Sequence, residues 1–155
     1  MKSSIRSATI GAAVSAVALT GLAVAPAAHA TTVKCDVDKI GTSFHPVCGR
    51  RTDDGDPGGV SGSVEVYLKS VPDMRAFAIF DANGEKFDAI NYLHRPMRFV
   101  LQWKDGSGRI HTAVDRVLDD GERQSWNLSL PEGVRVCIAT GDSILGHAGM
   151  TTLRA

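Results

Sequence analysis

A dominant sign of charge is absent from this sequence. Its 155 residues include 17 Lys and Arg against 17 Asp and Glu, so the formal net charge is zero. The two signs are interspersed and no basic stripe runs along the chain, which argues against nucleic acid and anionic membranes as partners. Aromatic residues are also scarce, at 6% of the chain, which leaves few rings for a sugar-stacking site.

Motifs of catalysis and of metal binding are missing as well. The histidines after residue 30 are widely separated and form neither His-x-His nor His-Glu-x-x-His: His45, His94, His111 and His147. The acidic run at residues 53–56 (DDGD) offers oxygens suited to Ca²⁺. It lacks the alternating ligand spacing and the closing glutamate of an EF-hand. We therefore expect no metal ion, no cofactor and no catalytic residue, and we predict that the protein is not an enzyme.

One short block, GDSIL at residues 141–145, resembles the nucleophile block of the GDSL-type esterases. That family carries the block near the N-terminus and follows it late in the chain with an Asp-x-x-His pair. Here twelve residues follow Ser143 and none forms that pair. His147 lies close by, but no acidic residue is evident to orient it. A small hydrolase therefore remains only a second alternative function.

The first 30 residues have the pattern of a secretory signal peptide. Lys2 and Arg6 precede an uncharged apolar run at residues 8–25, and an Ala-His-Ala motif ends at Ala30. The alternative is a retained membrane anchor, since the run is just long enough to span a bilayer. Its Ala- and Gly-rich composition and the cleavage motif favour removal. We predict a signal helix cleaved between Ala30 and Thr31 and a secreted, extracellular protein with no membrane contact thereafter.

The chain from Thr31 onward has 125 residues, with 15 basic and 17 acidic side chains and a net charge of −2. This length supports one domain with a real core, and it is short enough for a disulfide to matter. We expect three parts: the signal peptide (1–30), a disulfide-closed segment with a Gly- and Asp-rich loop (31–61), and a β-sandwich core with a C-terminal tail (62–155).

Alternation of apolar and polar residues predicts strands. Six segments show it or read as buried strands: residues 64–69, 75–80, 98–104, 110–115, 126–130 and 134–139. Turn-forming pairs such as Asn83-Gly84 and Asp120-Gly121 separate several of them. Residues 88–95 (DAINYLHR) fit either a short helix or a strand followed by a loop, and residues 51–62 (RTDDGDPGGVSG) are predicted to be a loop. We predict an all-β fold, an antiparallel β-sandwich or partly open barrel of six to eight strands.

Three cysteines in an exported chain leave one without an intramolecular partner. Cys35 and Cys48 have twelve residues between them, and closing such a loop stabilises the fold by roughly 3 kcal/mol in the entropic account. We favour a Cys35–Cys48 disulfide over the alternative, in which Cys137 pairs with one of the two. Cys137 would then be either a small, covered thiol or an exposed one that links two chains. The protein is accordingly a monomer or a Cys137-linked dimer.

Several short motifs resemble those of a group of small secreted actinobacterial all-β proteins. They are FDANGEKF at residues 80–87, LPEG at 130–133, a strand that ends in Val136-Cys137, and a Gly-containing tail. The resemblance implies an all-β fold and supplies no activity. In that group a second cysteine typically follows in the tail, where this chain has Ala148. The resemblance thus implies that Cys137 lacks its usual partner, which supports the local Cys35–Cys48 pairing.

The aromatic residues and the missing motifs together shape the functional prediction. Trp103 and Trp126 fall on the apolar sides of their strands and are expected in the core, whereas Tyr67 is expected on a polar face. Our leading hypothesis is a non-catalytic secreted module that contacts an extracellular protein or glycan. The alternative is a secreted protease or glycosidase inhibitor. Its presenting element would be the Cys35–Cys48 loop, with Phe44, Pro46 and Arg50 near its end.

Overall fold

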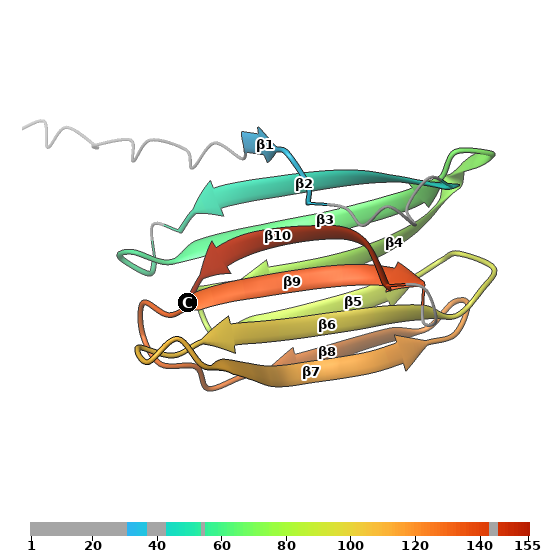
Figure 1. The fold of residues 1–155 in the computed structure, drawn as a ribbon. Helices are drawn as coiled ribbons and strands as arrows, with labels where there is room; N and C mark the ends of the chain where they lie inside the picture. The colour runs from blue at the N-terminus through green and yellow to red at the C-terminus, as the bar shows by residue number, and fades with distance from the viewer. Residues whose placement is uncertain (1–30, 37–42, 54, 143–145) are drawn as a thin grey trace, which may run out of the picture.

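The computed structural model describes residues 31–36, 43–53, 55–142 and 146–155, and these form an all-β protein (Figure 1). The predicted signal peptide, with the whole of its Ala-His-Ala motif, lies outside the described residues. Within these ranges ten strands follow one another: β1 (Thr31–Val33), β2 (Phe44–Thr52), β3 (Val60–Leu68), β4 (Val71–Asp81), β5 (Lys86–Asn91), β6 (Met97–Lys104), β7 (Ile110–Leu118), β8 (Arg123–Asn127), β9 (Arg135–Asp142) and β10 (Gly146–Arg154).

The strands form one antiparallel sheet that folds over into two layers. Layer A is β7-β6-β9-β10, and layer B is β2-β3-β4-β5-β8 with β1 paired to the edge of β2. The layers join where Arg154 of β10 pairs with Val60 of β3, so that the sheet nearly closes into a barrel. Figure 1 shows layer A in front of layer B. The predicted antiparallel sandwich or partly open barrel is confirmed, with ten strands in place of six to eight.

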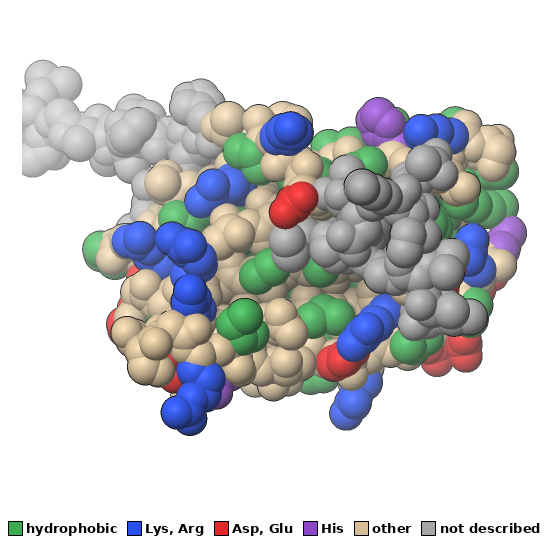
Figure 2. Space-filling model, viewed as in Figure 1, with side chains coloured by type: hydrophobic (Ala, Val, Ile, Leu, Met, Phe, Trp, Pro, Cys, Tyr) green, Lys and Arg blue, Asp and Glu red, His purple; other side chains and the backbone are tan. Residues whose placement is uncertain are grey.

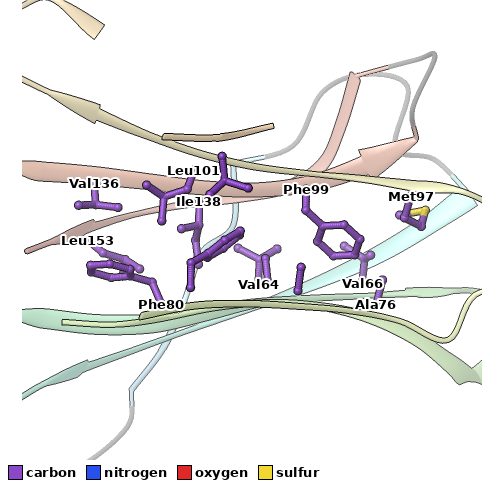
Figure 3. Close-up of a cluster of buried hydrophobic side chains, with 14 of the residues drawn as sticks. Val64, Val66, Ala76, Phe80, Met97, Phe99, Leu101, Val136, Ile138 and Leu153 are labelled. Atoms are coloured by element: carbon purple, nitrogen blue, oxygen red, sulfur yellow. The ribbon is translucent and has the colours of Figure 1, made fainter. Parts of the chain in front are cut away.

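The hydrophobic core lies between the two layers (Figure 3). Layer A contributes Met97, Phe99 and Leu101 from β6 and Val136 and Ile138 from β9, all fully buried. Layer B contributes alternate residues of β3, β4 and β5, among them Val64, Val66, Ala76, Phe80 and Phe87. Burial of each large apolar side chain contributes about 1.5–3 kcal/mol, which makes this interior the main source of stability. The alternation read from the sequence therefore assigns the core side of β3, β6 and β9 correctly.

The N-terminal part is more ordered than its sequence predicts. Residues 44–52 show little alternation, yet they form β2 and pair along the whole length of β3. Phe44 and Cys48 enter the core from this strand. The predicted loop at residues 51–62 shrinks to 53–59 because β2 runs to Thr52 and β3 begins at Val60. Tertiary pairing thus overrides a weak local pattern.

Residues 88–95 resolve into a strand followed by bends. Residues 88–91 belong to β5, and no helix forms there. The fully buried Asn91 stabilises the bends, because its amide Nδ2 donates to the carbonyl oxygens of Arg95 and Leu118, each at 2.9 Å. Its Oδ1 accepts a hydrogen bond from the backbone N–H of Leu93 at 3.0 Å. One buried amide therefore satisfies two backbone carbonyl oxygens and one backbone N–H group at these bends.

Candidate functional site

Apolar side chains gather on the outward side of layer B. Cross-strand partners point to the same side of a sheet, and the register places Val47, Phe77 and Ile90 in one row that passes through Glu65. Ile79 lies in the adjacent row, beside Ser63. With Tyr67 they form a partly exposed surface that we call the apolar face: Val47, Tyr67, Phe77, Ile79 and Ile90.

Strand β4 explains how this surface arises. The sequence reads RAFAIF at residues 75–80, apolar on both sides. Ala76, Ala78 and Phe80 are buried between the layers, whereas Phe77 and Ile79 point outward and stay partly exposed. Strand β4 is therefore buried on its inner side and partly exposed on its outer side. No helix or strand among the described residues packs over this outer side.

Tyr67 occupies the outward position that the sequence predicts. Its ring centroid lies 4.9 Å from that of His45, and the guanidinium carbon of Arg75 lies 5.8 Å from the ring centroid. Arg75 also forms an ion pair with Glu65 on the same face. The neighbours of Tyr67 are thus a histidine and a cation, which give it polar edges without a second stacked aromatic ring.

A shallow groove crosses the apolar face where two small residues face each other. Gly49 of β2 and Ser63 of β3 are register partners. A Cβ built on Gly49 would lie 3.2 Å from the hydroxyl oxygen of Ser63, so that a larger side chain there would crowd the groove. The groove has a volume of about 270 Å³ and is bounded by Ile79, Arg51 and Asp81. Its small and apolar lining suits a flat or extended neutral group.

Most charges around the apolar face are matched in pairs. Arg51 lies 3.4 Å from Asp81, and Lys86 lies 3.3 Å from Asp88. Together with the Arg75–Glu65 pair, these contacts neutralise the rim of the surface. Because uncompensated charge opposes desolvation, a neutralised rim lowers the cost of covering this face with a partner.

Two carboxylates meet at one end of the sandwich. The hydroxyl group of Ser61 lies 3.2 Å from Asp53 and 3.3 Å from Asp81, and it accepts a hydrogen bond from the N–H of Ala82 at 2.8 Å. The N–H of Gly55 donates to Asp53 at 3.1 Å, which lowers the pKa of that carboxyl group below its usual value. These contacts clamp the 53–59 loop against the end of β4.

The DDGD run at residues 53–56 offers carboxylate oxygens suited to Ca²⁺. Residue 54 lies outside the described residues. Within the described ranges, no group of three or more His, Cys, Asp or Glu side chains is arranged to hold a metal ion. An open acidic pocket of about 550 Å³ lies next to the 53–59 loop. Asp56, Glu85 and Glu132 help to line it.

The clearest acid–histidine contact is in the β6–β7 hairpin. His111 Nε2 lies 2.8 Å from Asp105 Oδ2, and the His111 ring stacks on Trp103 with 4.2 Å between centroids. Asp105 Oδ1 also accepts hydrogen bonds from the N–H groups of Ser107 and Arg109 and from the Ser107 hydroxyl. The hydrogen bond with His111 is the main cause that holds the pKa of Asp105 far below its usual range, and the other contacts add to it.

This hairpin contact does not have the geometry of a catalytic triad. The carboxylate contacts both the serine and the histidine, whereas a triad needs the histidine between them. The contact therefore serves to fix the hairpin. His94 pairs with Asp120 between two loops, and His45 neighbours Tyr67. His147 belongs to β10, but its side chain lies outside the described residues.

The cysteines follow the favoured pairing. Cys35 and Cys48 form a disulfide with 5.3 Å between their Cα atoms, and Cys137 is free and partly buried. Burial raises the pKa of the Cys137 thiol, and the carboxylate of Asp36 raises it further. The tail lies beside Cys137 as β10, with Thr152 as its register partner, rather than across it. A raised pKa disfavours the reactive thiolate, so the covered-thiol interpretation fits this environment best.

The residues proposed for hydrolase and inhibitor activity lie in other contexts than expected. Asp142 of the GDSIL block is buried and forms an ion pair with Arg95, while Ser143 lies outside the described residues. Phe44, Pro46 and Arg50 were expected near the end of a presenting loop. They all belong to strand β2, and Phe44 is buried in the core.

The outward side of layer A carries a feature that the sequence analysis missed. Lys104 pairs in register with Arg135, and Arg135 pairs with Arg154. We call these three exposed residues the basic row. Figure 2 shows Lys and Arg side chains gathered at the end of this face where β9 begins and β6 and β10 end. Because the three residues are far apart in sequence, only the strand register could have revealed them.

The two tryptophans behave as predicted. Trp103 and Trp126 are partly buried and pack against the core, and Trp126 stacks on the fully buried Phe87 with 5.6 Å between centroids. Neither ring belongs to the apolar face or to the basic row. The aromatic residues of the apolar face are therefore Tyr67 and Phe77.

Comparisons with protein-family models, with curated proteins and with solved structures found no match to this chain. In the part of the chain that the structure describes, no helix has the length and apolar character needed to cross a membrane.

Proposed function

We propose that this protein is a secreted, non-catalytic β-sandwich that acts by contact with an extracellular protein or glycan through its apolar face. The observation that carries the proposal is the set of outward apolar side chains on four neighbouring strands, β2 to β5, which Glu65 and Ser63 interrupt only on β3. Exposed apolar patches with polar rims are typical of contact surfaces. The signal-peptide pattern supports an extracellular setting.

The groove and the rim make this surface suitable for selective contact. The groove above Gly49 and Ser63 gives the face a recessed centre, while Tyr67 and the Arg75–Glu65 pair supply hydrogen-bonding groups at one side. An apolar centre with a neutralised polar rim resembles the anatomy of protein–protein interfaces. It favours a protein partner over a flat glycan, which would call for more exposed aromatic rings.

The proposal is testable by site-specific photo-crosslinking. A photo-reactive residue is placed at Ser63, in the groove, or at the exposed Thr112 of layer A as the matched control. In cultures of the producing cell we expect a discrete adduct from position 63 alone. A second substitution, Ile79→Lys, should abolish it, whereas Val117→Lys on the opposite outer face should not. Co-sedimentation of the same variants with cellulose and chitin tests for a glycan partner.

The outcomes separate the proposal from its failure. Equal crosslinking from both positions, or adducts that survive Ile79→Lys, would show that the apolar face is not the contact surface. Thermal unfolding of each variant checks that Ile79→Lys leaves the fold intact. Rates of trypsin, subtilisin and amylase with excess protein test the inhibitor alternative in the same preparations.

A further inference from the structure

The basic row is a cluster of like charge on the outward side of layer A. Lys104, Arg135 and Arg154 occupy neighbouring strands β6, β9 and β10 in direct register. None of the three forms an ion pair with a described residue, although five other Arg and Lys side chains do. Like charges directly opposite each other destabilise a sheet. Retention of such a row is physically costly unless an anion occupies it.

We propose that Lys104, Arg135 and Arg154 form a binding site for a linear anionic polysaccharide that bears a carboxylate on successive sugars. Adjacent strands lie about 4.8 Å apart, so the row presents cations at a spacing close to the length of one sugar residue in an extended chain. The polymer would lie across the strands. Each arginine can hold a carboxylate through two parallel N–H donors, which a lysine cannot.

The next row along the same face supplies groups for the uncharged part of a sugar. Gln102, Cys137 and Thr152 are register partners there. Thr152 is exposed, and its hydroxyl group can donate to or accept from a sugar hydroxyl. The amide of Gln102 donates to Thr112 at 3.2 Å, which leaves its carbonyl oxygen as an acceptor. Cys137 lies between these two residues, and the carboxylate of Asp36 acts on its thiol, so the polymer's carboxylates are expected at the basic row and its hydroxyl groups beside Gln102 and Thr152.

Nucleic acid fits this surface less well. Single-stranded nucleic acid binds basic grooves that also carry aromatic rings for base stacking. Among the described residues, Trp103 packs toward the core and Tyr67 lies on the opposite face, so the basic row has no exposed ring beside it. Three cations in a chain whose net charge from Thr31 onward is −2 are also far from a basic nucleic-acid-binding composition.

This inference is independent of the apolar face, because the two surfaces lie on opposite outer sides of the sandwich. Substitutions in the basic row should leave crosslinking from Ser63 unchanged. Ile79→Lys should leave polysaccharide binding unchanged. Failure of either proposal can therefore be recognised without reference to the other.

The test is a binding measurement with immobilised polygalacturonate, a linear polymer with a carboxylate on every sugar. The chain from Thr31 onward is prepared with its disulfide oxidised. Arg135→Gln, at the centre of the row, should weaken binding about tenfold. Arg123→Gln is the matched control, because Arg123 is an exposed arginine of β8, on layer B, and its loss changes net charge equally. Binding should also fall with salt, with a log–log slope of roughly −2 for three contacts.

Each outcome decides the assignment. Loss of affinity in Arg135→Gln with none in Arg123→Gln, together with no binding to uncharged amylose, supports the site. Equal losses in both variants would show attraction by net charge alone and would overturn it. Tighter binding to single-stranded DNA than to polygalacturonate, with the same dependence on Arg135, would replace the polysaccharide by a nucleic acid. Absence of binding at low salt would also overturn the proposal.

Discussion

The outer faces of layers A and B differ in how they arrange charge. On layer B, the three ion pairs Arg51–Asp81, Arg75–Glu65 and Lys86–Asp88 surround apolar side chains. On layer A, only Arg98 is matched, by a two-fold contact with Asp115 at 2.7 and 2.6 Å, while the basic row stands without described counterions. The first surface is prepared for covering by a neutral partner, and the second for an anion.

The inner sides of both layers pack against the same hydrophobic core. Alternation along a strand separates inner from outer residues, so Phe80 and Ile79 lie side by side in sequence but serve different purposes. The inner residues keep the two layers together. The outer residues are then free to differ from layer to layer without altering the fold.

The largest expected effect comes from breaking the shared interior. Phe80→Ala removes a fully buried ring and should lower the free energy of unfolding by about 3–5 kcal/mol. Phe77→Ala, three residues earlier and on the outer side, should cost no more than about 1.5 kcal/mol because its side chain is already partly exposed. Chemical denaturation of the two variants measures the difference. Similar losses would mean that the outer side of β4 is structural core.

The disulfide comes next, and it ties Cys35 to β2 at the edge of layer B. Replacement of both Cys35 and Cys48 by alanine should destabilise the fold by about 3 kcal/mol, since the bridge closes a short loop in the unfolded chain. Cys137→Ala should change stability by less than about 1 kcal/mol. A thiol count and the intact mass of the purified protein check the assignment directly. One free thiol on a monomer is expected, whereas a reducible dimer would place Cys137 at an interface.

The fold was predictable wherever a strand's own sequence alternates between apolar and polar residues. Residues 64–69, 98–104 and 134–139 alternate clearly, and β3, β6 and β9 follow. Strand β2 was missed because Pro46, Gly49 and the polar residues around them give no alternation, and its stability comes from pairing with β3. Strand β10 was missed for the same reason, since its Gly- and Ala-rich sequence gains order only beside β9.

The candidate sites were less predictable, because both depend on register. Phe77 and Ile79 could be assigned to a strand. They could not be assigned to its outer side, because the RAFAIF segment is apolar on both sides. Lys104, Arg135 and Arg154 lie on three different strands, and a linear search for basic stripes cannot bring them together. Sequence alternation fixes one side of one strand, whereas a surface site requires the pairing of several.

A pH experiment tests the contacts of Asp105, which fix the β6–β7 hairpin directly after Lys104. Its folded pKa lies far below the usual value, so its contribution to stability is present above about pH 4 and is lost as the pH falls below that value. Asp105→Asn should lower the melting temperature at neutral pH, and the gap to the unmodified protein should narrow in acid. A gap that stays constant with pH would assign the effect to packing rather than to charge.

The smallest expected changes in the free energy of unfolding are those of Arg98→Ala and Arg135→Gln, and they should have opposite signs. Arg98→Ala removes one partner of an exposed ion pair and should destabilise the protein by about 0.2–1 kcal/mol, less at high salt. Arg135→Gln removes the central member of three adjacent cations and should instead stabilise it by a few tenths of a kcal/mol. Opposite signs at low salt, converging as salt is added, would show that layer A pairs one of its charges and holds the others in mutual repulsion. If Arg135→Gln were destabilising, an unrecognised counterion would be stabilising the row, and the argument for an anionic ligand would lose its energetic basis.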